Sequence, residues 1–364
     1  MAYQIVCCFG ACSYGIDEET AAILQDDLLW HKNYGRCVCG NYSMAVLQGN
    51  QVLEDQCQFE SSQQFGTFVG IYDGHRGPDA ARFVCDRIFL RFQRIILATG
   101  YNTRVTAEPI ERAFLRMEEE FFDHVRELWN VQPSIATVGT CCLVGVVYHQ
   151  TLFIANCGDS RAILGRKDGG FTQLNTEHNA RITEIQNQLQ LLHPGDPNIV
   201  IINRGSWRVK GISQVTKSIG DAFLKRPEYN TEAIDYRLRL HPPHDHMPYL
   251  TAQPDIYTHQ LQQDDSFIIF ASHGLWKFLN NADAVKIVHK HPHSGSANKI
   301  IKAALKGAAR FHNMSYKRLC QTGKNARHIF HDDITVVVLF LNHDLIARGS
   351  TQRNPVSVRS ALDH

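Results

Sequence analysis

The chain has 364 residues, of which 44% are hydrophobic and 20% charged, so it can bury a sizeable core and does not have the composition of a disordered protein. Its 37 lysines and arginines nearly balance its 36 aspartates and glutamates, and a net charge of +1 gives no reason to expect binding to nucleic acid or to acidic membranes. The longest apolar runs, such as residues 336–341, are far shorter than the roughly 20 residues of a transmembrane helix. We therefore expect a soluble, globular protein.

The 11 cysteines indicate a reducing compartment, because their number is odd and several stand in apolar runs where free thiols pack as small hydrophobic groups. We expect a cytoplasmic or nuclear location. Residues 1–15 lack the basic start of a secretory signal. Acylation of Cys7, Cys8 or Cys12 would add a peripheral membrane association, whereas the simpler interpretation is an unmodified N-terminal tail.

Residues 1–40 show no lasting periodicity and are predicted to form a tail. The first clear element is a β-branched and aromatic segment, 65–72, which predicts a strand running into Asp73-Gly74-His75. A helix is predicted to begin at about residue 77, where a proline suits the first turn. A second helix is predicted over 109–129, because apolar residues recur there at helical spacing.

The rest of the chain alternates hairpin-linked strands with long helices. Strands are predicted at 138–148, 151–156, 161–165, 267–271 and 334–341, and helices at 180–192, 282–289 and 297–311. Strands joined by hairpins favour antiparallel sheets covered by helices over a βαβ winding. We expect one domain over 41–344 and a polar C-terminal tail over 345–364.

Acidic residues stand where the predicted strands begin or end. They are Glu54-Asp55, Asp73, Asp159 and Asp332-Asp333. A carboxylate beside a glycine at the end of a buried strand suits a hard cation, because the glycine leaves its carbonyl accessible. Ordinary turn chemistry is the alternative for any one of these acids, since Asp and Gly also begin turns for local reasons.

Six segments carry a combined signal. In chain order they are 52–55 (VLED), 68–75 (FVGIYDGH), 152–161 (LFIANCGDSR), 218–221 (SIGD), 271–276 (ASHGLW) and 332–336 (DDITV). This series, which spans roughly residues 43–343, resembles the motifs of the metal-dependent serine/threonine phosphatases of type 2C, and is closest to a plant subgroup. The resemblance implies an α+β fold, a sandwich of two antiparallel β-sheets flanked by helices on both sides.

The resemblance also implies the chemistry of the site. Two Mg²⁺ or Mn²⁺ ions would activate a water that attacks the phosphate of a phosphoprotein substrate. The metal-binding positions carried over from the family are Glu54, Asp55, Asp73, Gly74 and Asp332. Asp73 would bridge both ions, His75 would protonate the leaving alkoxide, and Asp159 matches an acid linked to a third, weaker metal.

The departures from the family pattern fall on the site itself, and they include Lys217, which replaces an arginine before Ser218. His273 stands where the family has an aspartate, and Lys277 stands where it has an acid. Together these changes shift the local charge by three units, and one pair of unit charges 4 Å apart is worth about 4 kcal/mol at an effective dielectric constant of 20. Imidazole is also a poor ligand for Mg²⁺ and is better tolerated by Mn²⁺. Arg76 replaces a glycine and is interpreted as a surface arginine, with a phosphate contact as the alternative.

Two functions therefore stay open. The first is a serine/threonine protein phosphatase, weakened by His273 and Lys277; the second is a phosphatase-shaped module that binds phosphoproteins without hydrolysing them. A hydrolase built on the histidines of residues 241–246 is a distant third hypothesis. We expect phosphoprotein partners, no nucleic acid and a monomer.

Overall fold

The computed structural model describes residues 27–98, 104–240, 247–348 and 354–360, and places them in two antiparallel sheets packed face to face. The first sheet has six strands, in the order β1 (Leu29–Cys37), β2 (Gly40–Leu47), β14 (Ile334–Leu341), β13 (Asp265–Ala271), β7 (Arg161–Arg166) and β8 (Phe171–Gln173). The central strands β2, β14 and β13 come from the two ends of the domain. Distant sequence segments therefore meet in this sheet.

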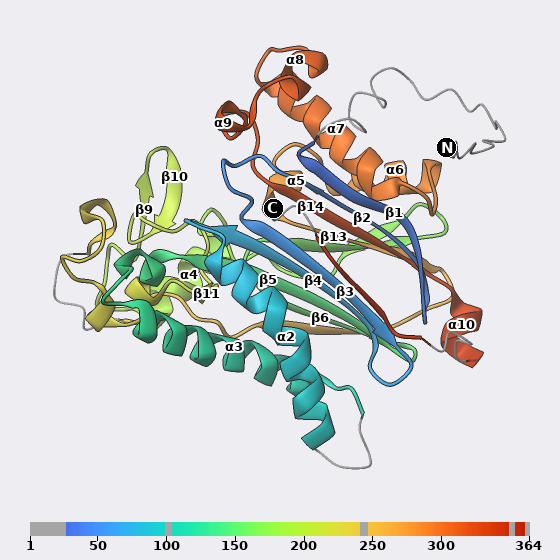
Figure 1. Cartoon of the computed structure of the whole chain (residues 1–364), viewed down its shortest axis with the longest axis horizontal. Helices are drawn as coiled ribbons and strands as arrows, with labels where there is room; N and C mark the ends of the chain where they lie inside the picture. The colour runs from blue at the N-terminus through green and yellow to red at the C-terminus, as the bar shows by residue number, and fades with distance from the viewer. Residues whose placement is uncertain (1–26, 99–103, 241–246, 349–353, 361–364) are drawn as a thin grey trace, which may run out of the picture.

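The second sheet has the order β12 (Asp255–Gln260), β6 (Thr151–Cys157), β5 (Gly139–Tyr148), β4 (Gly66–His75), β3 (Asp55–Ser62) and β15 (Val356–Arg359), and β11 (Ile219–Gly220) also pairs with β5. Two of its neighbouring pairs, β3–β4 and β5–β6, are joined by the hairpins that the sequence pattern predicted, and longer connections join the others. A separate hairpin of β9 (Val200–Asn203) and β10 (Ser206–Val209) lies at the left end of the sandwich in Figure 1.

Helices cover the outer faces of both sheets (Figure 1). On the second sheet lie α2 (Asp79–Ala98) and α3 (Ala107–Leu128), and on the first lie α5 (His273–Trp276), α6 (Asn281–Lys290) and α7 (Ser296–Phe311). The shorter helices are α4 (Thr183–Leu192), α8 (Tyr316–Cys320), α9 (Lys324–Arg327) and α10 (His343–Arg348), with 3₁₀ turns η1 (Pro133–Thr137), η2 (Ala222–Leu224), η3 (Pro227–Tyr229) and η4 (Tyr236–Leu238). The predicted α+β sandwich with helices on both sides is confirmed.

The sandwich has three apolar layers, one between the sheets and one under each group of helices. Alternation along the central strands supplies two layers at once: on β14, Val337 faces the other sheet while Val336 and Val338 face α7. On β4, Ile71 points between the sheets and Tyr72 points toward the helices. Strands buried on both faces explain why these segments read as continuous apolar runs.

Both predicted tails contain strands. β1 lies within residues 1–40 and pairs with β2, and β15 lies within 345–364 and pairs with β3. Both are edge strands with polar sequences and are held largely by backbone hydrogen bonds, so they lack the apolar pattern that marks the central strands. The N-terminal cysteines and the histidines of 241–246 fall outside the described residues. Within the described ranges, no helix is long and apolar enough to cross a membrane.

Candidate active site

Four of the acidic residues singled out in the sequence, Glu54, Asp73, Asp159 and Asp332, line one cavity of about 780 Å³ at an end of the sandwich. Antiparallel pairing brings the end of β4 beside the start of β3, and the end of β13 beside the start of β14. The predicted residues that line the cavity are Glu54, Asp73, Gly74, His75, Asp159, His273 and Asp332. These residues, which are distant in the sequence, therefore meet in one cavity, whose lining between the two sheets is called the floor below.

Asp73 lies at the centre of this floor. Its Oδ2 accepts a hydrogen bond from the backbone N–H of His273 at 2.8 Å, and it faces Asp55 across the β3–β4 pair. Asp55 is buried beneath the floor, where its Oδ2 accepts a hydrogen bond from the Thr335 hydroxyl at 2.7 Å. Burial, followed by the charge of neighbouring acids, raises the pKa of both carboxyl groups well above the usual range. The close packing of these carboxyl groups therefore favours the binding of a cation at the floor.

Glu54 extends this negative potential along the wall. Burial, assisted by the charge of Asp333, raises the pKa of Glu54 to about 7. The backbone carbonyl of Glu54 accepts the N–H of Gly74 at 3.2 Å, and a Cβ on Gly74 would lie 2.4 Å from that carbonyl oxygen. Only glycine fits this close approach of the two strands.

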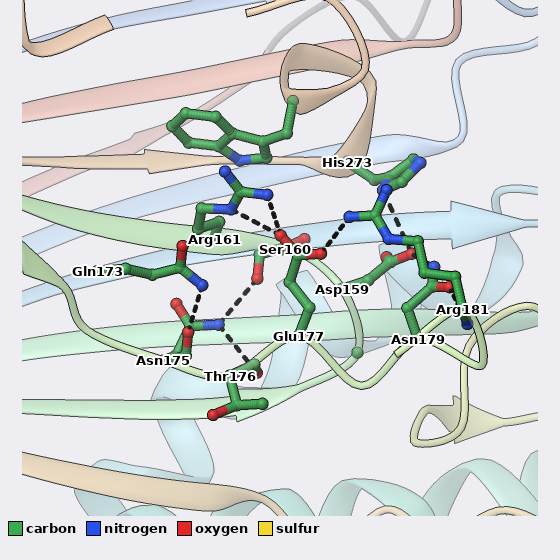
Figure 2. Close-up of polar contacts among 12 residues, drawn as sticks. Asp159, Ser160, Arg161, Gln173, Asn175, Thr176, Glu177, Asn179, Arg181 and His273 are labelled. Atoms are coloured by element: carbon green, nitrogen blue, oxygen red, sulfur yellow. Dashed lines mark hydrogen bonds and ion pairs between the residues drawn. The ribbon is translucent and has the colours of Figure 1, made fainter. Parts of the chain in front are cut away.

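The side chain of His273 lies next to the carboxylate of Asp159 (Figure 2). Its Nδ1 lies 3.3 Å from Asp159 Oδ2, within ion-pair distance although not aligned as a hydrogen bond. The same oxygen accepts a hydrogen bond from Asn179 Nδ2 at 2.8 Å. Burial acts to raise the pKa of Asp159, but the charge of His273 and these hydrogen bonds outweigh it, so the pKa is lowered. In the same corner, Glu177 is bound by two arginines, Arg161 and Arg181.

Lys277 forms an ion pair with Asp332. Its Nζ lies 2.8 Å from Asp332 Oδ2, while Asp332 Oδ1 accepts a hydrogen bond from Asn50 Nδ2 at 2.9 Å. Burial acts to lower the pKa of Lys277, but the charge of Asp332 outweighs it and raises the pKa. The neighbouring Asp333 accepts backbone N–H groups of Gly49 and Glu54 and so fixes the loop before β3.

His75 is oriented by Asp221, a residue to which the sequence assigned no role. Its Nε2 lies 2.8 Å from Asp221 Oδ2, and Arg76 Nη1 donates to Asp221 Oδ1 at 2.7 Å. Arg76 is thus bound to a buried carboxylate, which corrects its interpretation as a surface arginine. A Cβ on Gly139 would lie 2.3 Å from Asp221 Oδ2 and 2.6 Å from His75 Nε2, so this contact requires glycine. The SIGD segment was the only signal for Asp221.

The two sides of the cavity floor differ in their donor groups. On the Asp73 side, carboxylate oxygens and the Gly74 carbonyl are the hard ligands that Mg²⁺ and Mn²⁺ prefer. On the Asp332 side, the ammonium group of Lys277 forms an ion pair with the Asp332 carboxylate. The imidazole of His273 lies where an oxygen ligand is expected, and it contacts Asp159. Within the described ranges, no three His, Cys, Asp or Glu side chains form a group arranged to hold a metal ion.

Comparisons with known proteins agree with the geometry. A family model described as "Protein phosphatase 2C" matches residues 34–313. "Probable protein phosphatase 2C 42" of Arabidopsis thaliana is 55% identical over 347 residues, which cover 93% of this chain and 89% of that one. "Probable protein phosphatase 2C 36" of Oryza sativa is 50% identical, with 95% and 90% covered. Among solved structures, the "serine-threonine phosphatase 2C from Toxoplasma gondii" has a TM-score of 0.63 at 15% identity and covers 86% of this chain and 99% of that one.

Proposed function

Because the chain belongs to the protein phosphatase 2C family, in a plant subgroup, we propose that it hydrolyses phosphoserine and phosphothreonine in phosphoproteins, at a rate reduced by His273 and Lys277. The family and the fold are those of protein phosphatases. The observation that carries the proposal is the meeting of Asp73, Glu54 and His75 in one cavity, where Asp73 accepts the backbone N–H of His273 and His75 contacts Asp221.

The proposed cofactors are two Mg²⁺ or Mn²⁺ ions, which when bound would activate a water and neutralise charge on the phosphate. Asp73, Glu54 and the Gly74 carbonyl would hold the first ion, with Asp55 supporting Asp73 from beneath. Asp332 would hold the second ion only after its ion pair with Lys277 opens. Asp159 would contribute to a third position only after losing its contact with His273.

His75 would supply a proton to the leaving alkoxide of the serine or threonine. The contact with Asp221 leaves Nδ1 as the ring nitrogen without a hydrogen bond among the described residues, and it fixes the plane of the ring. Asp221 is therefore proposed as a positioning residue for His75.

The test is hydrolysis of a phosphothreonine peptide with Mg²⁺ or Mn²⁺ as the sole divalent ion. We expect low turnover that is greater with Mn²⁺, because nitrogen ligands suit Mn²⁺ better than Mg²⁺. Asp73→Asn serves as the inactive control. Activity that is equal in the parent and in this variant would refute the assigned site.

The second candidate function is phosphoprotein binding without hydrolysis. The Lys277–Asp332 ion pair favours it, since the ammonium group of Lys277 already neutralises the Asp332 carboxylate that would bind a metal ion. Saturable binding of a phosphopeptide with no phosphate release under either metal would select this function. A monomeric state and a cytoplasmic or nuclear location complete the proposal.

A further inference from the structure

The rim of the cavity is basic, in contrast to its acidic floor. Arg204 and Arg208 belong to the β9–β10 hairpin and line the same cavity as Asp73. Arg204 and Gly205 form the two-residue turn of this hairpin, and both have left-handed φ angles, of 52° and 75°. Such a turn matches the twist of the two strands and is therefore compact. The hairpin presents its arginines from a well-defined backbone.

These two arginines have no acidic partner among the residues that the structure describes. Arg204 is exposed and makes no ion pair there. Arg208 Nη1 donates to the carbonyl oxygen of Ile212 at 2.8 Å, but its Nε is buried without a hydrogen-bond partner. Burial, and then the charges of Arg76 and Arg204, lower the pKa of Arg208, because nearby positive charges disfavour its charged form.

The other arginines of the cavity are neutralised. Arg76 is paired with Asp221, and Arg237 on η4 is paired with Asp235 through two contacts of 3.0 Å. The uncompensated charge at the rim therefore comes from Arg204 and Arg208. Guanidinium groups with unused donors bind carboxylate and phosphate oxygens strongly, often through two parallel hydrogen bonds.

The cavity has room for more than one side chain. Its volume of about 780 Å³ falls within the range of roughly 300–1,000 Å³ of pockets that enclose drug-sized ligands. A phosphorylated residue at the acidic floor, near Asp73 and His75, would leave the rim open to a neighbouring residue of the same peptide. The floor and the rim would therefore bind different groups, because the floor is acidic and the rim is basic.

We propose that Arg204 and Arg208 form an anion subsite that binds a second negatively charged side chain beside the phosphorylated residue. The substrates are then acidic or multiply phosphorylated segments of phosphoproteins, rather than isolated phosphorylated residues in neutral surroundings. The inference rests on the proposed function, because it assumes that the floor receives a phosphorylated side chain. It applies equally to a site that hydrolyses and to one that only binds.

The experiment measures binding of three fluorescent peptides that carry a non-hydrolysable phosphonate in place of the phosphate, with Mn²⁺ present. One peptide has neutral flanking residues, one has flanking aspartates, and one has a second phosphorylated residue. The proteins are the parent, Arg204→Gln, Arg204→Gln with Arg208→Gln, and Arg310→Gln. Arg310 is the matched control, since it is exposed on α7, lies outside the cavity and has no acidic partner in the described part of the chain.

The parent should bind the two acidic peptides about tenfold more tightly than the neutral one, as expected for one or two charge-assisted hydrogen bonds. This preference should fall about threefold in Arg204→Gln, disappear in the double variant and persist in Arg310→Gln. It should also weaken between about 0.05 M and 0.5 M salt, because screening acts on exposed charges. The doubly phosphorylated and aspartate peptides distinguish phosphate from carboxylate as the preferred group.

Equal affinity for all three peptides in the parent would overturn the subsite while leaving the proposed function intact. A double variant that keeps the preference would overturn the subsite as well. A thermal unfolding transition of the double variant that matches the parent's shows that the variant is folded. Absence of binding to every peptide by the parent would overturn both the subsite and the proposed function.

Discussion

The ammonium nitrogen of Lys277 lies 2.8 Å from Oδ2 of Asp332, and each side chain is about two-fifths exposed, at 39% and 40%. An ion pair this open to solvent contributes little to stability, on the order of 0–1 kcal/mol. Its importance is chemical, because it occupies the carboxylate that a second metal ion would need. A metal ion that binds Asp332 would have to compete with the ammonium group of Lys277 for the same carboxylate.

Charge restoration is expected to raise activity. His273→Asp together with Lys277→Glu should increase metal affinity and hydrolysis of a phosphothreonine peptide by about 10- to 100-fold, the range seen when metal-site residues are altered. His273→Asp alone should recover more than Lys277→Glu alone, because it restores an oxygen ligand. Initial rates of all four proteins at fixed Mn²⁺ check this order. Equal, high rates throughout would mean that the two departures are neutral.

Asp73→Asn should abolish divalent binding and yet stabilise the metal-free protein. The substitution removes a buried negative charge that lies opposite Asp55, so we expect a gain of about 1 kcal/mol in the free energy of unfolding. Calorimetric titration with Mn²⁺ and thermal unfolding in a chelator measure the two effects. Binding of Mn²⁺ equal to the parent's would contradict the central role of Asp73.

Glu54 should make the stability of the metal-free protein depend on pH. Its pKa is about 7 in the folded chain and about 4.3 when unfolded, so the folded state binds the extra proton between these values and loses stability as pH rises through them. Glu54→Gln should therefore stabilise the protein by about 1–2 kcal/mol at a pH near 8 and have no effect near 4. Denaturant titrations at both pH values provide the measurement. The exposed Glu108→Gln serves as control and should change neither.

Asp221→Asn should destabilise the protein by about 2–3 kcal/mol at neutral pH, since the buried carboxylate accepts charge-assisted hydrogen bonds from Arg76 and from His75 when the imidazole is protonated. Burial acts to raise the pKa of Asp221, but His75 and Arg76 lower it overall, below the unfolded value of about 3.9. This contribution is therefore present above that pH and is lost as pH falls further.

Denaturation of parent and variant from pH 7 down to about 3 tests this dependence. Asp235→Asn, which breaks an exposed pair with Arg237, is the matched control and should show no measurable change. A deficit in Asp221→Asn that stayed constant down to the lowest pH would show that the carboxylate's charge is not the cause.

The sequence predicted the central strands and the acids at their ends, because strands buried on both faces keep long apolar runs and end at polar residues. The edge strands β1 and β15 escaped prediction, since backbone pairing needs no apolar pattern. The link from Asp221 to His75 spans 146 positions in the chain and leaves no periodic signal. The positions of Arg204 and Arg208 at the cavity depend on how a short hairpin folds over it, which local sequence does not determine.

The cavity floor is shared between the two sheets, since Asp73 ends a strand of one and Asp332 precedes a strand of the other. A ligand bound by both residues would therefore link the two sheets. Its binding energy would then oppose any opening that separates the layers, in addition to holding the loops around it. Amide protons of β4 and β14, including those far from the cavity, would then exchange with solvent more slowly when a ligand is bound. Hydrogen exchange of these core strands would therefore report the occupancy of the site.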